Sequence, residues 1–249
     1  MTNQLTDKLT DRLKIALFIP CYVDQFYPQV GIATLELLEK CGCEVHYPLN
    51  QTCCGQPMAN SGFSSLTKEC DANFIKNFEG YDYIVSPSGS CVLHIKEHVM
   101  PHEKKIYELC EFVTDVLKVE NINATFKHRV GFHNSCHGQR ILGLSSMSEK
   151  VGEQFSKPLS LLHQVKGLKF VELDRPDECC GFGGTFCVTE EAVSVKMGKD
   201  RVADHLSKNV EFIIGGDMSC LMHIEGILKR QKSSVKVLHI AEILNGGYV

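Results

Sequence analysis

The chain alternates short apolar runs with longer stretches in which apolar residues recur at helical spacing. The short runs are rich in β-branched or aromatic residues and bounded by Gly, Pro or Ser, which predicts buried strands. They are Ile15–Pro20, Tyr83–Ser86, Arg129–His133, Phe212–Gly215 and a less regular Glu44–Tyr47. Helical spacing predicts helices over Val30–Lys40, Ser64–Phe78, Lys104–Lys118, Glu190–Leu206 and Leu221–Arg230. This alternation is typical of an α/β fold with parallel sheets covered by helices.

The same landmarks occur twice in the same order. In each half a strand leads into a cysteine, Cys21 or Cys136, and a Cys-Cys-Gly triplet follows. A later strand then runs into a Ser-Cys-x-x-His-Ile segment. The order predicts a duplication, with two pseudo-symmetric Rossmann-like halves over residues 1–125 and 126–249. The polar stretch Asn121–Lys127 is the expected boundary.

Composition narrows the classes of function. The chain has 249 residues with 26 basic and 30 acidic side chains, a net charge of −4 and no Lys/Arg-rich run, so we expect no nucleic-acid partner. No apolar stretch is long enough to span a membrane. Met1–Lys14 is polar, which predicts a short tail or surface helix and no secretory signal. We therefore expect a cytoplasmic protein, in which 13 cysteines favour metal or thiol chemistry over disulfides.

Eight cysteines occupy matching places in the two halves and are the candidate metal ligands. Ligands bind beyond the carboxyl ends of parallel strands, and four of these cysteines directly follow a predicted strand. The adjacent cysteines of each triplet can serve one site only from a turn, for which Gly55 and Gly181 provide the backbone freedom. The first set is Cys21, Cys53, Cys54 and Cys91, and the second is Cys136, Cys179, Cys180 and Cys220.

Four thiolates per half meet the usual requirement of a [4Fe–4S] cluster and also that of a tetrahedral zinc ion. Zinc modules generally take ligands as close Cys-x-x-Cys pairs, which this chain lacks. Adjacent cysteines are easier to place on different irons of a larger cluster. We therefore favour one or two iron–sulfur clusters, most simply [4Fe–4S], over zinc.

Five segments carry a resemblance to a known family. The chain resembles the cysteine-rich CCG-domain proteins, which include the cysteine-rich subunit of heterodisulfide reductase, the iron–sulfur subunit of glycolate oxidase and a branch acting in lactate utilization. The resemblance implies an iron–sulfur electron-transfer subunit of a complex that oxidises L-lactate to pyruvate, with a ferredoxin-like iron–sulfur subunit and a third subunit as partners. The segments are Gln51–Gly62, Ser86–Cys91, His133–Arg140, Cys179–Phe186 and Gly215–Ile224.

The end of each repeat differs between this chain and the heterodisulfide reductase relatives, in which each copy ends in Cys-x-x-Cys. Here His94 and His223 take the last place, as additional ligands or proton donors. His133 and His137 flank Cys136 and are candidates for contacts with the ligands or with a substrate, although the first half has Phe18 and Tyr22 at the same offsets from Cys21.

Two other functions stay open from the residues alone. One is a cluster-based thiol or disulfide reductase subunit, and the other is a non-redox zinc-binding module. We interpret Asp217, Lys196 and Arg140 as surface charges rather than contacts for a carboxylate substrate. The unmatched cysteines are interpreted as small buried residues, with Cys187 the candidate exception near the second triplet: Cys41, Cys43, Cys70, Cys110 and Cys187.

Overall fold

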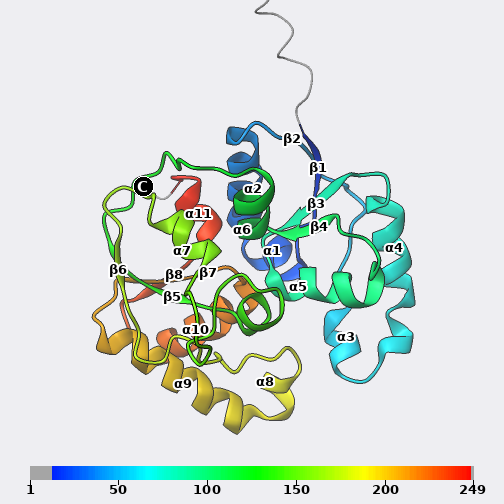
Figure 1. The fold of residues 1–249 in the computed structure, drawn as a ribbon. Coiled ribbons are helices and arrows are strands. Elements are labelled where there is room, and N and C mark those ends of the chain that lie inside the picture. Colours follow the sequence, from blue (N-terminus) through cyan, green and yellow to red (C-terminus); the bar gives the residue numbers. More distant parts are fainter. Residues whose placement is uncertain (1–12, 248–249) are drawn as a thin grey trace, which may run out of the picture.

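The structure is a computed structural model that describes residues 13–247. Within that range the chain forms two parallel sheets of four strands, with the orders β2-β1-β3-β4 and β6-β5-β7-β8 (Figure 1). The identical strand order confirms the α/β fold and the two similar halves. The strands are β1 (Lys14–Leu17), β2 (Glu44–His46), β3 (Tyr83–Ser86), β4 (Ile106–Glu108), β5 (Arg129–His133), β6 (Lys169–Val171), β7 (Phe212–Gly215) and β8 (Lys236–His239).

Helices cover both faces of each sheet, as parallel strands buried on both sides require. The α-helices of the first half are α1 (Cys21–Phe26), α2 (Pro28–Lys40), α3 (Gln56–Asn60), α4 (Lys68–Phe78), α5 (Gly89–His94) and α6 (Leu109–Glu111). Those of the second half are α7 (Lys157–Leu162), α8 (Phe186–Thr189), α9 (Glu191–Ser207), α10 (Met218–Arg230) and α11 (Ile240–Leu244). Short 3-10 or π-helical turns occupy Ser64–Leu66, Ile95–Val99, Phe112–Val116 and His137–Ile141.

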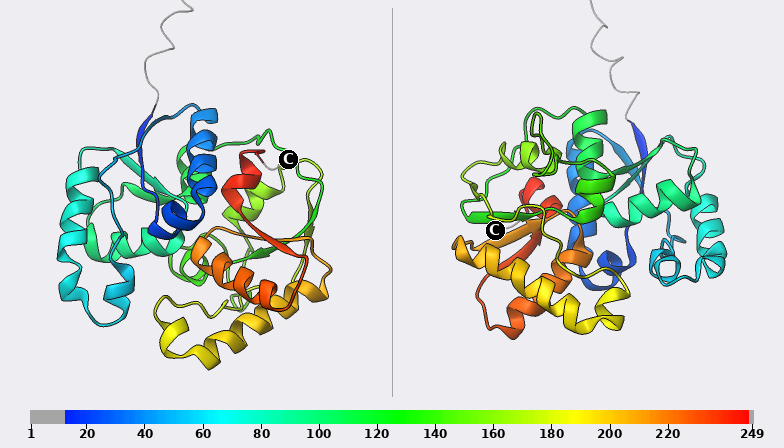
Figure 2. Two further views of the ribbon diagram at one scale, coloured as in Figure 1. Left: turned by 180° about the vertical axis from the view of Figure 1, so that it is seen from behind. Right: turned by 60° about the horizontal axis from the view of Figure 1, so that its bottom comes forward.

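The two halves share one hydrophobic core. Successive side chains of a strand point to opposite faces, so Ile15 and Leu17 of β1 enter this shared core. Ala16 and Phe18 instead face a smaller core beneath α4. The shared core continues into the second half through α2 and α11, which lie side by side between the sheets (Figure 2). A division between residues 125 and 126 stays a prediction.

One predicted helix is wrong. Lys104–Lys118 begins with strand β4, which pairs in parallel with β3, and only then turns helical. The chain turns helical there because the side-chain Oε2 of Glu108 accepts hydrogen bonds from the backbone N–H groups of Cys110 and Glu111, which caps α6. The apolar pattern of the sequence does not predict strands β6 and β8, because polar residues around them obscure it. The prediction of a short tail or surface helix over Met1–Lys14 lies outside the described residues, except that Lys14 begins β1.

Candidate metal centres

Each Cys-Cys-Gly triplet forms a tight turn. Gly55 and Gly181 adopt φ values of +85° and +84°, the left-handed region that favours glycine. The turn folds back, so that the Gly55 N–H lies 3.4 Å from Cys53 Sγ and the Gly181 N–H lies 3.4 Å from Cys179 Sγ. The structure therefore confirms the expected turn, and each turn supplies a backbone donor to a sulfur atom.

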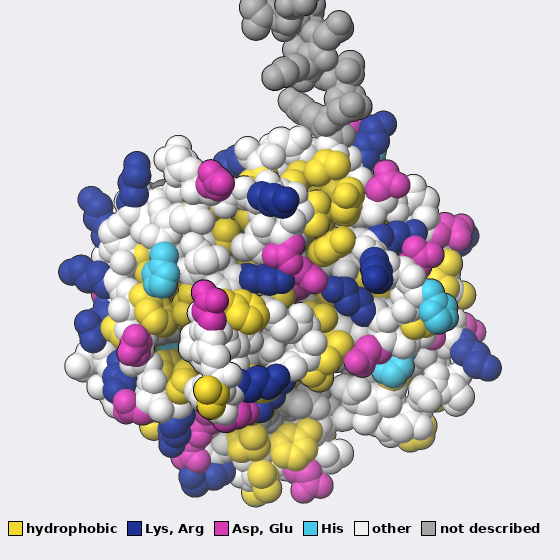
Figure 3. Space-filling view, viewed as in Figure 1, with side chains coloured by type: hydrophobic (Ala, Val, Ile, Leu, Met, Phe, Trp, Pro, Cys, Tyr) yellow, Lys and Arg dark blue, Asp and Glu magenta, His cyan; other side chains and the backbone are white. Residues whose placement is uncertain are grey.

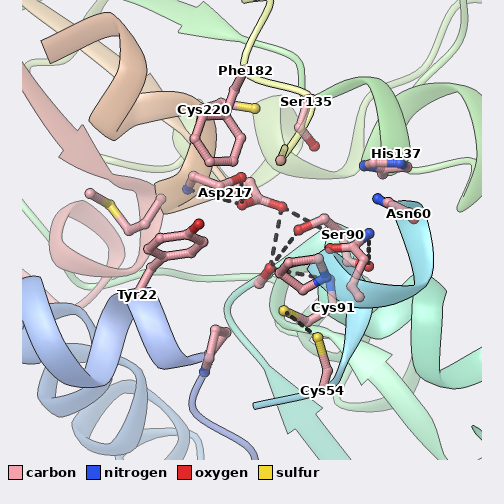
Figure 4. Close-up of a pocket in the computed structure, with 18 of the residues that line it drawn as sticks. Tyr22, Cys54, Asn60, Ser90, Cys91, Ser135, His137, Phe182, Asp217 and Cys220 are labelled. Carbon is pink, nitrogen blue, oxygen red and sulfur yellow. Dashed lines mark hydrogen bonds between the residues drawn. The ribbon is translucent and has the colours of Figure 1, made fainter. Parts of the chain in front are cut away.

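The first four cysteines come together from three separate segments. Cys21 begins α1 directly beyond β1, and its Sγ lies 3.8 Å from Cys53 Sγ. Cys54 Sγ lies 3.4 Å from Cys91 Sγ, which α5 carries (Figure 4). The carboxyl ends of β1 and β3 thus bring together residues that are far apart in the sequence.

The second four cysteines repeat this arrangement. The Cys136 thiol interacts with Cys179, and the Cys180 thiol interacts with both Cys179 and Cys220. Cys180 Sγ, Cys220 Sγ and a ring nitrogen of His133 all lie within 4.8 Å of one another. A buried histidine therefore lies beside two cysteines of the second set.

The close approach of the sulfur atoms shifts the pKa values of the thiols. Hydrogen bonds from Cys21 and Cys54 lower the pKa of Cys53 to about 2, and those from Cys136 and Cys180 lower the pKa of Cys179 to about 2. The donating thiols have raised pKa values for the same reason. Four sulfur atoms at this spacing repel one another as thiolates unless a cation lies between them. The donor set therefore suits a metal ion or cluster.

A single carboxylate holds the two cysteine-bearing helices together. Asp217 Oδ1 accepts the Ser219 N–H at 3.2 Å, which caps α10 in front of Cys220. Asp217 Oδ2 accepts the Ser90 N–H at 2.9 Å and the Ser88 hydroxyl at 3.2 Å, in the first turn of α5. The surface interpretation of Asp217 is therefore wrong, because the side chain is buried across the junction of the halves. Its signal in the sequence is its place three residues before Cys220, where Ser88 precedes Cys91.

All eight cysteines line one cavity of about 220 Å³ between the halves. Figure 4 shows Cys54, Cys91 and Cys220 among its lining residues. Tyr22 and Phe182 stack edge to face beside it, with ring centroids 5.9 Å apart. Ser90, Asn60 and Asp217 contribute polar groups (Figure 4). One solvent-connected space thus joins the two cysteine sets.

The four candidate histidines have different places. His137 lines the cavity, whereas His133 is buried beside Cys180. His94 is buried behind the first triplet, where desolvation lowers its pKa against opposing effects of Asp71 and Cys53. His223 lies behind the second triplet, with Nε2 3.4 Å from the Ser194 carbonyl. Neither His94 nor His223 belongs to the cavity lining, so a ligand role for either stays a prediction.

The remaining candidates are engaged in contacts outside the two cysteine sets. Lys196 and Arg140 form exposed ion pairs with Asp200 and Glu149, as expected for surface charges. Cys187 donates to the Gly184 carbonyl at 3.1 Å. Among the unmatched cysteines, Cys43 and Cys110 are buried as expected, and Cys41, Cys70 and Cys187 are half-buried.

On the face of the molecule shown in Figure 3, basic and acidic side chains are interspersed. Between residues 13 and 247 the protein has no helix that is both long enough and apolar enough to cross a bilayer.

Comparison with known proteins supports the duplicated arrangement. The model of the cysteine-rich domain family named CCG matches twice, at residues 15–96 and 130–225. Lactate utilization protein A of Geobacillus sp. (strain WCH70) is 42% identical over 246 residues, covering 94% of this chain and 99% of that protein. Lactate utilization protein A of Bacillus subtilis (strain 168) is 42% identical over 248 residues with the same coverage.

Among solved structures, a hypothetical protein from Helicobacter pylori is similar with a TM-score of 0.63 and 14% identity, which bears on the fold alone. The similarity covers 95% of this chain and 49% of that one. The repeated match and the matched cysteine sets lead to one conclusion: the chain belongs to the family of proteins with the cysteine-rich CCG domain.

Proposed function

We propose that this chain is an iron–sulfur electron-transfer protein of lactate utilization, with one cluster in each cysteine set. The observation that carries the proposal is that two equivalent four-cysteine sets line one cavity. Four thiolates per set match the ligand requirement of a [4Fe–4S] cluster. The metal-ligand roles of all eight cysteines are part of this proposal.

The protein's own groups suit such centres. Cys21, Cys53, Cys54 and Cys91 would hold the first, and the matching second set the other; when bound, clusters of this kind supply one-electron carriers. The Gly55 and Gly181 N–H groups donate to ligand sulfur atoms, and hydrogen bonds to sulfur tune the reduction potential. Tyr22 and Phe182 place aromatic rings in the lining of the cavity.

The lactate assignment rests on the relatives, which are called lactate utilization protein A. Oxidation of L-lactate to pyruvate releases two electrons and two protons, and two one-electron sites match that number of electrons. We propose that a partner subunit oxidises the substrate and that a ferredoxin-like subunit exchanges electrons with this chain in the cytoplasm.

The experiment is a determination of iron, acid-labile sulfide and zinc, with an EPR spectrum, on protein purified without air. We expect about eight irons and about eight sulfides per chain, from two four-iron clusters. Lactate added to the chain together with its partner subunits should then reduce the EPR-active centres, whereas lactate added to this chain alone should not. Iron and sulfide absent under anaerobic conditions would overturn the proposal.

A second candidate is a zinc-binding module. With Zn–S bonds of about 2.3 Å, tetrahedral sulfur atoms lie about 3.8 Å apart. The Cys21–Cys53 and Cys54–Cys91 separations of 3.8 and 3.4 Å are close to that value. Zinc without iron or sulfide would select this candidate.

A further inference from the structure

A second cavity, of about 540 Å³, is formed by residues of the second half alone. It lies beside β5, β6 and α7 and is larger than the cavity of about 220 Å³ that the cysteines line. Small-molecule sites in proteins generally measure about 300–1,000 Å³. The cavity therefore has the size of a ligand site, and the proposed electron transfer does not use it.

A single short segment, residues 134–139, contributes to both cavities. Its Asn134 and Gln139 line the larger cavity, whereas Cys136 and His137 line the cavity of the cysteines. A ligand in the larger cavity therefore contacts the same stretch of backbone that carries the first cysteine of the second set.

Another wall of the larger cavity leads into the second triplet. Pro176 and Asp177 line the cavity, and Cys179 follows two residues after Asp177. The Asp177 carboxylate accepts hydrogen bonds from the Gln139 side-chain amide and, at 2.6 Å, from the Ser148 N–H. One carboxylate thus joins the segment before Cys179 to the segment after Cys136.

A further wall is a loop without a counterpart in the first half. Residues 142–156 connect the π-helical turn after Cys136 to α7, whereas in the first half Tyr27 alone separates α1 from α2. The loop is held in place by its own hydrogen bonds. The Ser146 N–H donates to the Phe155 carbonyl at 2.8 Å, and the Phe155 N–H donates to the Ser146 hydroxyl at 2.6 Å. The chain's own contacts therefore shape the cavity.

Aromatic side chains form one part of the lining. Phe132, Phe155 and Phe170 line the cavity, and His163 packs edge to face against Phe170 with ring centroids 6.0 Å apart. The Phe155 side chain is 52% exposed, so part of its ring remains open for contact. Aromatic rings pair favourably with other rings in offset-stacked or edge-to-face arrangements. This part of the lining therefore suits a planar ring.

The polar part of the lining suits a hydrogen-bond donor and not an anion. Glu172 and Asp177 contribute carboxylate oxygens, which accept hydrogen bonds. Asn134 and Gln154 contribute side-chain amides, which both donate and accept. Among the described residues that line the cavity, none is Lys or Arg, so a phosphate or carboxylate group would have no cationic partner there.

We propose that this cavity is a binding site for an uncharged planar heterocycle that carries N–H and C=O groups at its edge. The phenylalanine rings would contact its faces, and the carboxylate and amide groups would pair with its edge. L-Lactate and other anions are disfavoured there by the two carboxylates. The site does not depend on the proposed iron–sulfur function, because its walls belong to the chain itself.

The probe is oxidised lumiflavin, an uncharged planar ring with an N–H between two C=O groups. It is titrated by isothermal titration calorimetry into the full-length protein purified without air. We expect saturable binding of one lumiflavin per chain. 3-Methyllumiflavin lacks only the N–H donor and should bind about tenfold more weakly, because the acceptors of the site are left unpaired. Absence of saturable lumiflavin binding, equal affinity for both rings, or displacement of lumiflavin by L-lactate would overturn the proposal.

A variant that fills the cavity tests whether lumiflavin binds at this place. Ser160→Phe adds a ring to the lining from α7 and should weaken lumiflavin binding by about tenfold or more. Ser207→Phe is the matched control, because Ser207 lies outside the lining. Both serines are exposed on a helix, and each hydroxyl donates at 2.7 Å to the carbonyl three residues earlier. Equal affinities of the two variants would overturn the assignment.

A second variant removes a ring without filling the cavity. Phe155→Ala should weaken lumiflavin binding, whereas Val151→Ala, a fully exposed residue of the same loop outside the lining, should leave it unchanged. Thermal unfolding of each variant checks that it is folded. Wild-type affinity in Phe155→Ala would refute the ring contact even where Ser160→Phe does not fold.

Hydrogen-exchange mass spectrometry of the wild-type protein locates the site without any variant. Bound lumiflavin should slow exchange in peptides that cover residues 134–139 and 142–156. Peptides that cover residues 19–24, the matching segment of the first half, should be unchanged. Protection confined to other segments would overturn the proposal. None of these readouts needs iron, so absence of iron would overturn the proposed function and leave the result for this site intact.

Discussion

Removal of the Asp217 carboxylate should destabilise the protein at the junction of its halves. The carboxylate accepts four hydrogen bonds, two within α10 and two from the first turn of α5. In Asp217→Ala the loss of the helix cap costs about 1 kcal/mol. The Ser90 N–H is left buried without its acceptor, which costs a further 1–3 kcal/mol or so. The total of roughly 2–4 kcal/mol corresponds to a fall in Tm of roughly 4–16 °C for a chain of this size.

The assay is thermal and urea unfolding of metal-free protein under reducing, anaerobic conditions, followed by circular dichroism. Ser88→Ala is the matched variant, since it removes only the hydroxyl that caps α5 and should cost about 1 kcal/mol. Because the Ser88 hydroxyl donates to Asp217, the double variant should be less destabilised than the sum of the two. A loss under about 1 kcal/mol in Asp217→Ala, or strict additivity, would refute the view that one carboxylate joins the two helices.

Three further outcomes are expected. Cys54→Ser and Cys180→Ser should each remove about half of the bound metal, whereas the buried Cys110→Ser variant should keep all of it. Metal analysis of the three variants checks this, and an equal loss from all three would show that the ligand set is wrong. Burial raises the pKa of Glu108 from 4.5 to about 8, so the folded protein holds a proton that the unfolded chain releases above pH 4.5. The free energy of unfolding should therefore fall between pH 4.5 and 8, by up to about 1.4 kcal/mol per pH unit, and Glu108→Gln should flatten the profile measured by urea unfolding. Gly181→Ala should lower both Tm and metal content, because residue 181 has φ +84° and a Cβ there would lie 2.7 Å from Met197 Cβ. Gly42→Ala is the control, since Gly42 has φ +89° and open space around it. This variant should lower only the free energy of unfolding, by about 1–2 kcal/mol.

The local pattern of apolar residues was sufficient to predict the strands that carry the site. Tyr83–Ser86, Arg129–His133 and Phe212–Gly215 are strands with the predicted bounds, because their apolar runs are buried on both faces. The same reasoning failed at Lys104–Lys118, where tertiary pairing of Ile106 beside β3 overrides the helical spacing. Edge strands such as β6 have too few apolar residues to be seen in a single sequence.

The sequence by itself determined the duplication, the eight matched cysteines and the glycine at each triplet. These features are local in the chain: a Cys-Cys turn needs a residue with positive φ wherever it folds. What only the tertiary structure decided is the surroundings of the cysteines. Asp217 caps α10 and also accepts the Ser90 N–H of α5 in the other half, and His133 lies beside Cys180 and Cys220. No spacing rule encodes such contacts, because they depend on how the two sheets share one core and bring distant strand ends together.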